Sequence, residues 1–144
     1  MKKLLVGTLA VLALLSARAE SLEWQTDLPK AQAQAKTEKK LVMLDFTGSD
    51  WCGWCIKLNK EVFSQPEFAE YAKKNVVAVE VDFPRKKTLS AAQTTANGAL
   101  AKKYAIQGYP TIIVLDGDGK KVGELGYMKG GPKAFIAELD KLKK

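Results

Sequence analysis

Cys52 and Cys55 are the only cysteines of this chain, and two residues separate them in the segment Trp-Cys-Gly-Trp-Cys. Two thiols at this spacing can bind a metal ion, carry a covalently attached haem, form a structural cross-link or work as a redox couple. Zinc usually takes four Cys or His ligands, but the chain has no histidine. Haem attachment needs a histidine directly after the second cysteine, where this chain has Ile56. The sequence therefore disfavours the metal and the haem.

The structural cross-link and the redox couple remain as alternatives. A disulfide stabilises a fold mainly by closing a long loop of the unfolded chain, and a bond between Cys52 and Cys55 would close a loop of only four residues. Cys52 follows an apolar run and precedes a helical pattern, which predicts that its thiol lies at a helix N-terminus. The helix dipole and the unpaired N–H groups there lower the pKa of a thiol and favour the reactive thiolate. Cys55, one helical turn later, could attack a mixed disulfide formed at Cys52 and release the partner.

Strands and helices alternate along the chain around this pair. Apolar runs predict buried strands over 41–47, 76–82 and 111–115. The turn Asp-Gly-Asp-Gly at 116–119 predicts a hairpin, and the glycines within its second arm, 120–128, predict a twist or a bulge there. After the cysteines, apolar residues at helical spacing predict a helix. This stripe consists of Ile56, Leu58, Val62 and Phe63.

The remaining helices are marked by capping residues. Asp27 can cap an N-terminal helix. Ser64 and Glu67 have the spacing of a capping box, which predicts a short helix with Pro66 in its first turn. The helix capped by Asp27 is expected over 27–39, and the short helix follows Ser64. A third helix runs through Leu100 and Tyr104, and a closing amphipathic helix covers 130–144.

The composition suits one folded domain. Of the 144 residues, 47% are apolar and 27% are charged, which is typical of a globular chain with one hydrophobic core. The order of the elements predicts an α/β fold in which helices cover both faces of a central mixed β-sheet.

Residues 1–19 have the three-part pattern of a secretory signal peptide. Lys2 and Lys3 form a positive start, an apolar stretch follows over 4–15, and Ala-Arg-Ala at 17–19 resembles a cleavage site. A membrane-spanning helix would need roughly 20 apolar residues, and this stretch has twelve. We expect an exported protein whose mature domain is 20–144, without stable membrane insertion after cleavage.

The charge of the mature domain is mild. The full chain has a net charge of +7, and removal of 1–19 leaves 20 basic and 16 acidic residues, a net charge of +4. The densest basic run, Pro-Arg-Lys-Lys at 84–87, has no interleaved aromatic residues to stack bases, so we expect a solvated loop and no binding of nucleic acid. The segment that begins with Asp-Gly-Asp-Gly-Lys does not match a calcium-binding loop. Such a loop needs Gly at its sixth position and Glu at its twelfth, where this chain has Lys121 and Tyr127.

The segment Leu-Asp-Phe-Thr-Gly-Ser-Asp-Trp-Cys-Gly-Trp-Cys at 44–55, combined with Gly-Tyr-Pro-Thr at 108–111, resembles the thioredoxin family. Within it, the chain is similar to exported bacterial thioredoxin-like proteins, and the resemblance covers nearly all of 22–144. It implies a thioredoxin fold and a thiol–disulfide oxidoreductase that needs no metal or organic cofactor. Its partners would be disulfide- or thiol-bearing proteins, including a thiol protein that donates or accepts electrons, and we expect a monomer.

The resemblance also implies roles for the site residues. In this family the first cysteine, here Cys52, is the exposed nucleophile, and the second, here Cys55, resolves the mixed disulfide. Asp45 matches the buried acid that accepts the proton of the resolving thiol. Period-two alternation turns Leu44 and Phe46 away from it, and burial would raise its pKa. If Asp45 were instead exposed, it would be an ordinary strand carboxylate.

A substrate-binding surface is implied by the same resemblance. Pro110 matches the family's cis-proline, whose neighbouring backbone groups can pair with an extended substrate strand, and Tyr109 would shape that groove. Trp51 would pack beside the active-site turn, while Gly53 and Trp54 would face the substrate, Trp54 as an exposed apolar surface.

Two features depart from a minimal thioredoxin. Trp54 stands where thioredoxins commonly carry proline, which leaves the direction of catalysis open, with reduction favoured. Residues 83–98 form a longer and more polar region, beginning with a loop over 83–91, that is either a surface insertion or a partner contact. We expect Lys57, on the helix after the cysteines, to be solvated.

The leading hypothesis is thus an exported thiol–disulfide oxidoreductase. A chaperone-like binding module without redox turnover is one alternative, and a structural domain with an inert disulfide is another.

Overall fold

The computed structural model describes residues 21–143, so the signal peptide predicted at 1–19 lies outside the described residues. A five-stranded mixed sheet forms the centre, in the order β1-β3-β2-β4-β5. Strands β1 and β2 run parallel to β3, whereas β4 is antiparallel to both β2 and β5. The strands are β1 (Trp24–Gln25), β2 (Leu41–Thr47), β3 (Val76–Asp82), β4 (Thr111–Leu115) and β5 (Lys121–Leu125).

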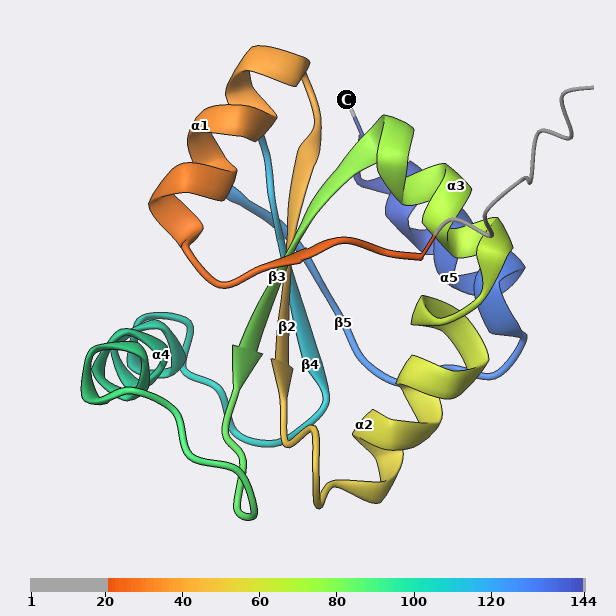
Figure 1. Cartoon of the computed structure of the whole chain (residues 1–144). Coiled ribbons are helices and arrows are strands. Elements are labelled where there is room, and N and C mark those ends of the chain that lie inside the picture. The colour runs from red at the N-terminus through yellow and green to blue at the C-terminus, as the bar shows by residue number, and fades with distance from the viewer. Residues whose placement is uncertain (1–20, 144) are drawn as a thin grey trace, which may run out of the picture.

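Helices cover both faces of this sheet, as the order of the elements predicts (Figure 1). One face carries α1 (Leu28–Glu38) and α4 (Ala91–Lys103). The other carries α2, η1, α3 and α5, which are Gly53–Leu58, the π-helical segment Asn59–Phe63, Pro66–Asn75 and Gly131–Lys141. The thioredoxin-like architecture expected from the sequence is therefore confirmed.

The alternation of side chains along β2 divides the core into two layers. Val42, Leu44 and Phe46 pack toward α1 and α4. Leu41 and Met43 pack toward α3 and α5. Asp45 has the same parity as these two residues and therefore points to the face that carries α2.

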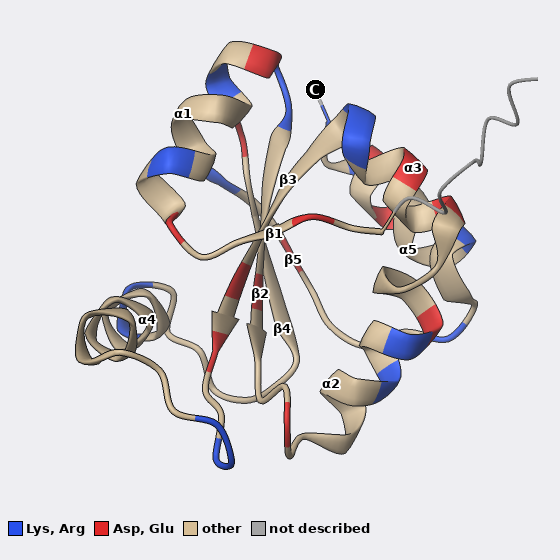
Figure 2. Ribbon diagram, viewed as in Figure 1, with Lys and Arg blue, Asp and Glu red and all other residues tan. Residues whose placement is uncertain are grey.

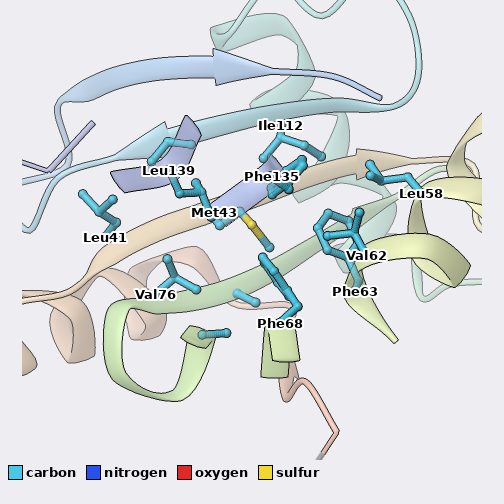
Figure 3. Packing of buried hydrophobic residues seen from close by; sticks show 13 residues of the cluster. Leu41, Met43, Leu58, Val62, Phe63, Phe68, Val76, Ile112, Phe135 and Leu139 are labelled. Carbon is cyan, nitrogen blue, oxygen red and sulfur yellow. The ribbon is translucent and has the colours of Figure 1, made fainter. Parts of the chain in front are cut away.

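Aromatic rings fill the core layer between the sheet and helices α3 and α5 (Figure 3). The ring centroids of Phe63, Phe68 and Phe135 lie 5.3–5.8 Å apart. At this separation aromatic rings attract one another beyond the gain from burial alone. The cluster joins η1, α3 and α5 into one unit, which fixes the helical segment that follows the cysteines.

The two predicted capping residues have different outcomes. The Asp27 side chain accepts a hydrogen bond from the Lys30 amide at 3.0 Å, so it caps α1 as predicted. The capping box of Ser64 and Glu67 is wrong. The N-cap of α3 is the extended residue Gln65, directly before Pro66, and it makes no side-chain cap. The Ser64 amide instead donates to Asn59, which ends the preceding π-helical segment.

Two local features of the sheet were unpredicted or only partly predicted. Strand β1 has two residues, too few to show a periodic pattern, and it pairs with Ala78 and Val79 of β3. The predicted irregularity of the hairpin occurs as a register shift between Val114 and Leu115. Within 21–143, no helix combines the length and apolar character needed to cross a membrane.

Phe135→Ala should lower the free energy of unfolding by about 3–5 kcal/mol. The side chain is fully buried, and its loss would leave a cavity between Phe63 and Phe68. Urea denaturation measures the change. Lys133→Ala, on the exposed part of the same helix, should change the free energy by less than about 0.5 kcal/mol. Equal losses in the two variants would contradict this assignment of the buried face of α5.

Candidate active site

The cysteines lie where β2 turns into α2. Backbone hydrogen bonds from the amides of Trp51 and Cys52 to the Gly48 carbonyl, at 3.2 and 2.8 Å, form the turn. Cys52 is the N-cap of α2, and its Sγ accepts the Cys55 amide at 3.2 Å. Cys52 and Cys55 are joined as a disulfide, with their Cα atoms 5.2 Å apart. The predicted position of Cys52 at a helix N-terminus is confirmed.

The expectation of an exposed Cys52 is wrong. Cys52 is 7% exposed as a residue, hardly more than Cys55 at 4%. The Sγ atom of Cys52 lies 3.7 Å from the carbonyl oxygen of Tyr109, on a segment 57 residues away in sequence. The loop that holds Tyr109 therefore lies against the disulfide and helps to cover Cys52.

Asp45 is buried on the same face of the sheet as Cys55. It is 7% exposed, and it lines a cavity of about 300 Å³ together with Cys55. Its Oδ1 atom has no hydrogen-bond partner among the described residues. Burial raises the pKa of Asp45 to about 8, with smaller contributions from the carboxylates of Glu80 and Asp82. Asp45 is thus a buried carboxyl group and not an exposed strand carboxylate.

Glu80 was missed by the sequence analysis, although it lies directly opposite Asp45 in the parallel pairing of β2 and β3. It is half-buried and lines the same cavity as Asp45 and Cys55. Burial raises the pKa of Glu80, and the charge of Asp82 raises it further, while Lys87 lowers it. Figure 2 shows these acidic positions on neighbouring strands. A charged residue within the valine-rich run 76–82 was the available signal.

Asp82 anchors the turn before the cysteines. Its carboxylate accepts the Ser49 amide at 2.9 Å and the Ser49 hydroxyl at 2.6 Å. Lys87 lies 2.7 Å from the same carboxylate. A buried charge is stable only with such partners, so Asp82 is a structural group that links β3, the turn and the loop at 84–88.

Trp51 packs beside the turn, as expected. A Cβ atom added at Gly48 would overlap the Trp51 indole, so only glycine allows this packing. The indole Nε1 donates to the Phe83 carbonyl at 2.7 Å. The ring also contacts Tyr109 edge-on, with the centroids 6.0 Å apart, and Tyr109 stacks on Phe83 at 5.3 Å. These three rings form one wall of the site.

Trp54 and Gly53 lie on the open side of the disulfide. Trp54 is 57% exposed, and a Cβ atom added at Gly53 would meet nothing within 4 Å. The Trp54 ring contacts Tyr127 at 4.9 Å. Lys57 lies 5.3 Å from both rings, so it is partly shielded by them and is not purely solvated.

The Tyr109–Pro110 peptide bond is cis. The residues expected in the site, which are Asp45, the 51–55 segment, Tyr109 and Pro110, lie together at one end of the sheet. Within 21–143 no three His, Cys, Asp or Glu side chains are grouped to hold a metal ion. Asp116 of the Asp-Gly-Asp-Gly segment accepts the amides of Asp118 and Lys120, both at 2.9 Å, as expected of a hairpin turn.

Comparison with known proteins agrees with this geometry. A family model described as a thioredoxin-like domain matches residues 28–143. The disulfide bond reductase DsbH of Chlamydia pneumoniae is 34% identical over 121 residues, which cover 84% of this chain and 72% of DsbH. The thioredoxin-related protein DsbJ of the same organism is 29% identical, but the match covers only 38% of its length.

Solved structures give the same result. A structure of a DsbH oxidoreductase superposes with a TM-score of 0.80 at 30% identity, covering 99% of this chain and 94% of that one. A thioredoxin from Thermus thermophilus shares the fold, with a TM-score of 0.63 at 24% identity and coverage of 85% and 87%. The chain therefore belongs to the thioredoxin-like family, and it is a thiol–disulfide oxidoreductase.

Proposed function

We propose that this protein is an exported reductase of protein disulfides, in which Cys52 attacks and Cys55 resolves. The observation that carries the proposal is the buried Asp45 carboxyl in the same cavity as Cys55. The direction is inferred from the similarity to a disulfide bond reductase over 84% of the chain. Export is inferred from the signal-peptide pattern of residues 1–19.

The reaction starts from the dithiol form. The Cys52 thiolate attacks one sulfur of the substrate disulfide, which forms a mixed disulfide and releases the first substrate thiol. The Cys55 thiolate then attacks the Cys52 sulfur and releases the second. The protein pair loses two electrons and becomes the disulfide, and the two protons of its thiols end on the two product thiols. A partner thiol protein returns the pair to the dithiol form.

The N-terminus of α2 supports the first step. The Cys55 amide points at the Cys52 sulfur from 3.2 Å, and a donor in that position stabilises a thiolate. The segment 53–63 continues from α2 into η1, so the helical backbone extends well beyond the cysteines.

Asp45 supports the second step. A carboxyl with a pKa of about 8 exists in both protonation states near neutral pH. It can therefore accept the proton of Cys55 when that thiol attacks and return it afterwards. Glu80 lies opposite Asp45 at the edge of the same cavity and acts on it as a positioning residue, because its negative charge helps to keep the Asp45 proton bound.

The proposed substrate surface includes residues on both sides of the disulfide. Trp51, Tyr109 and Pro110 would receive the extended substrate chain beside the disulfide, and Gly53 leaves room for it to approach. Trp54 and Tyr127 offer an apolar contact on the other side. A binding module without redox turnover would use the same surface, so the decisive test concerns turnover.

Wild-type protein should accelerate the reduction of insulin by dithiothreitol, and Cys52→Ser should reduce this rate to that of dithiothreitol alone. Cys55→Ser should instead accumulate a mixed disulfide, because Cys52 can still attack but cannot be released. Turbidity and intact-mass measurements follow the two outcomes. A reductase should also have a standard reduction potential, measured by equilibration with glutathione, that is more negative than about −230 mV. Catalysis by Cys52→Ser at the wild-type rate would end the proposal, and a more positive potential would reverse its direction.

Asp45→Asn should stabilise the disulfide form increasingly as the pH rises. The folded-state pKa of Asp45 is about 8, above its usual value of 3.8. Between these values the folded protein binds more protons than the unfolded chain, so the free energy of unfolding of the wild type falls with rising pH. Asparagine does not ionise, and one pKa unit corresponds to about 1.4 kcal/mol. We expect the advantage of the variant to grow by up to about 4 kcal/mol between pH 5 and 8.

Urea denaturation of both proteins at several pH values measures this advantage. A difference between the proteins that stays constant across the window would show that Asp45 is ionised throughout it, contrary to its assigned role.

Glu80→Gln should lower the pKa of Asp45, because the charge of Glu80 is the largest electrostatic contribution to its rise. NMR titration of the Asp45 carboxyl carbon measures the midpoint directly. Glu70→Gln, which removes an exposed carboxylate on α3, serves as the control and should leave the midpoint unchanged. If the two variants titrate alike, Glu80 has no influence on the proton of Asp45.

A further inference from the structure

The basic run at 84–87, between β3 and α4, lies at the same end of the sheet as the cysteines (Figure 2). We call this segment the basic loop. From the sequence, 84–87 was expected to be a solvated loop, and the region 83–98 that contains it was expected to be either a surface insertion or a partner contact. Its contacts in the structure distinguish between these two possibilities.

The basic loop is fixed to the active-site turn through Asp50. The Asp50 carboxylate accepts the backbone amides of Arg85, Lys86 and Lys87, at 2.9, 2.8 and 3.0 Å. These backbone donors hold the pKa of Asp50 below its usual range. The preceding residue, Phe83, donates its amide to the Thr47 carbonyl at 2.8 Å. A mobile surface insertion would not be bound at so many points to the turn that carries Cys52.

The basic side chains of the loop differ in their partners. Lys87 is held by Asp82 at 2.7 Å, with Glu80 at 3.8 Å, and its charge is therefore balanced. The Arg85 guanidinium lies over the Trp51 ring, 3.7 Å from the centroid. Within 21–143, neither Arg85 nor Lys86 has a carboxylate within ion-pair distance of its side chain. Both side chains are exposed and make no direct ion pair, although the charge of Lys86 acts on the nearby Asp50 carboxylate.

Arg85 is connected to the reacting sulfur by a short series of contacts. It covers Trp51, the Trp51 ring meets Tyr109, and the Tyr109 carbonyl lies 3.7 Å from Cys52 Sγ. A protein segment that presents its disulfide to Cys52 beside Tyr109 must pass within reach of Arg85. A guanidinium binds a carboxylate through two parallel hydrogen bonds. Stacking on Trp51 fixes its plane in advance, which lowers the entropy lost on binding.

We propose that the basic loop binds acidic residues that flank the disulfide of the partner protein, with Arg85 as the principal contact and Lys86 as a second cation. This inference rests on the proposed function, because it concerns the substrate of the same site. It makes the loop a determinant of specificity, whereas the sulfur chemistry belongs to Cys52 and Cys55.

The test compares three synthetic peptide disulfides, each a symmetric dimer whose cysteine is flanked by glutamate, glutamine or lysine. Bis(2-hydroxyethyl) disulfide serves as a small uncharged substrate, and dithiothreitol supplies the electrons. For wild type we expect kcat/KM to be about 5–20-fold higher for the glutamate peptide than for the glutamine peptide, lowest for the lysine peptide, with a preference that shrinks at high salt.

The double variant Arg85→Gln/Lys86→Gln should bring the glutamate-to-glutamine ratio to about 1 and leave the rate with bis(2-hydroxyethyl) disulfide within about twofold of wild type. The matched control is Lys39→Gln/Lys74→Gln, which removes the same charge at the opposite end of the sheet. It should keep the wild-type ratio.

The inference is overturned if wild type reduces the glutamate and glutamine peptides equally, or if the double variant keeps the wild-type ratio. If the loop acted only on the reactivity of Cys52, the double variant would change kcat/KM by the same factor for every substrate. The glutamate-to-glutamine ratio would then stay at its wild-type value, which overturns the inference. Failure of wild type to reduce even bis(2-hydroxyethyl) disulfide would instead contradict the proposed function.

Discussion

The burial of the Asp45 carboxyl next to the redox pair is the constraint on which this site depends. All seven residues of β2 are buried, and an ionised carboxylate in such surroundings is unfavourable. The same burial brings the pKa to about 8, where one group can both accept and return a proton near neutral pH. A surface carboxylate would stay ionised at this pH and could not return it. The proton transfer proposed for Asp45 therefore requires a central strand that is covered on both faces.

The parallel pairing of β2 and β3 places the supporting groups around that carboxyl. Because the two strands end at the same edge, the turn before Cys52 and the loop after β3 leave the sheet side by side. Asp82, at the end of β3, binds the turn through Ser49, and Asp50, in the turn, binds the loop. These reciprocal contacts fix two irregular segments that have no regular secondary structure of their own.

The sequence predicts what depends on local patterns. The apolar runs give strands β2, β3 and β4, and the position of Cys52 between a strand and a helical stripe gives its N-cap. What depends on distant contacts could not be predicted from these patterns. The covering of Cys52 requires the Tyr109 carbonyl, and the influence of Glu80 requires its register against Asp45. The Ser64 capping box failed because the preceding helix continues as a π-helical segment, which uses the Ser64 amide and moves the cap to Gln65.

The run Pro-Arg-Lys-Lys illustrates the same limit for charge. In the sequence alone its three cations are equivalent, because each adds one positive charge to the net charge. In the structure Lys87 is balanced by Asp82, Arg85 is stacked on Trp51, and the backbone amides of all three bind Asp50. A cation that makes no direct ion pair within the protein and whose geometry is fixed is suited to discriminate among partners. The capacity for recognition therefore comes from the acidic residues that hold the loop, since they decide which of its positive charges remains available beside the disulfide.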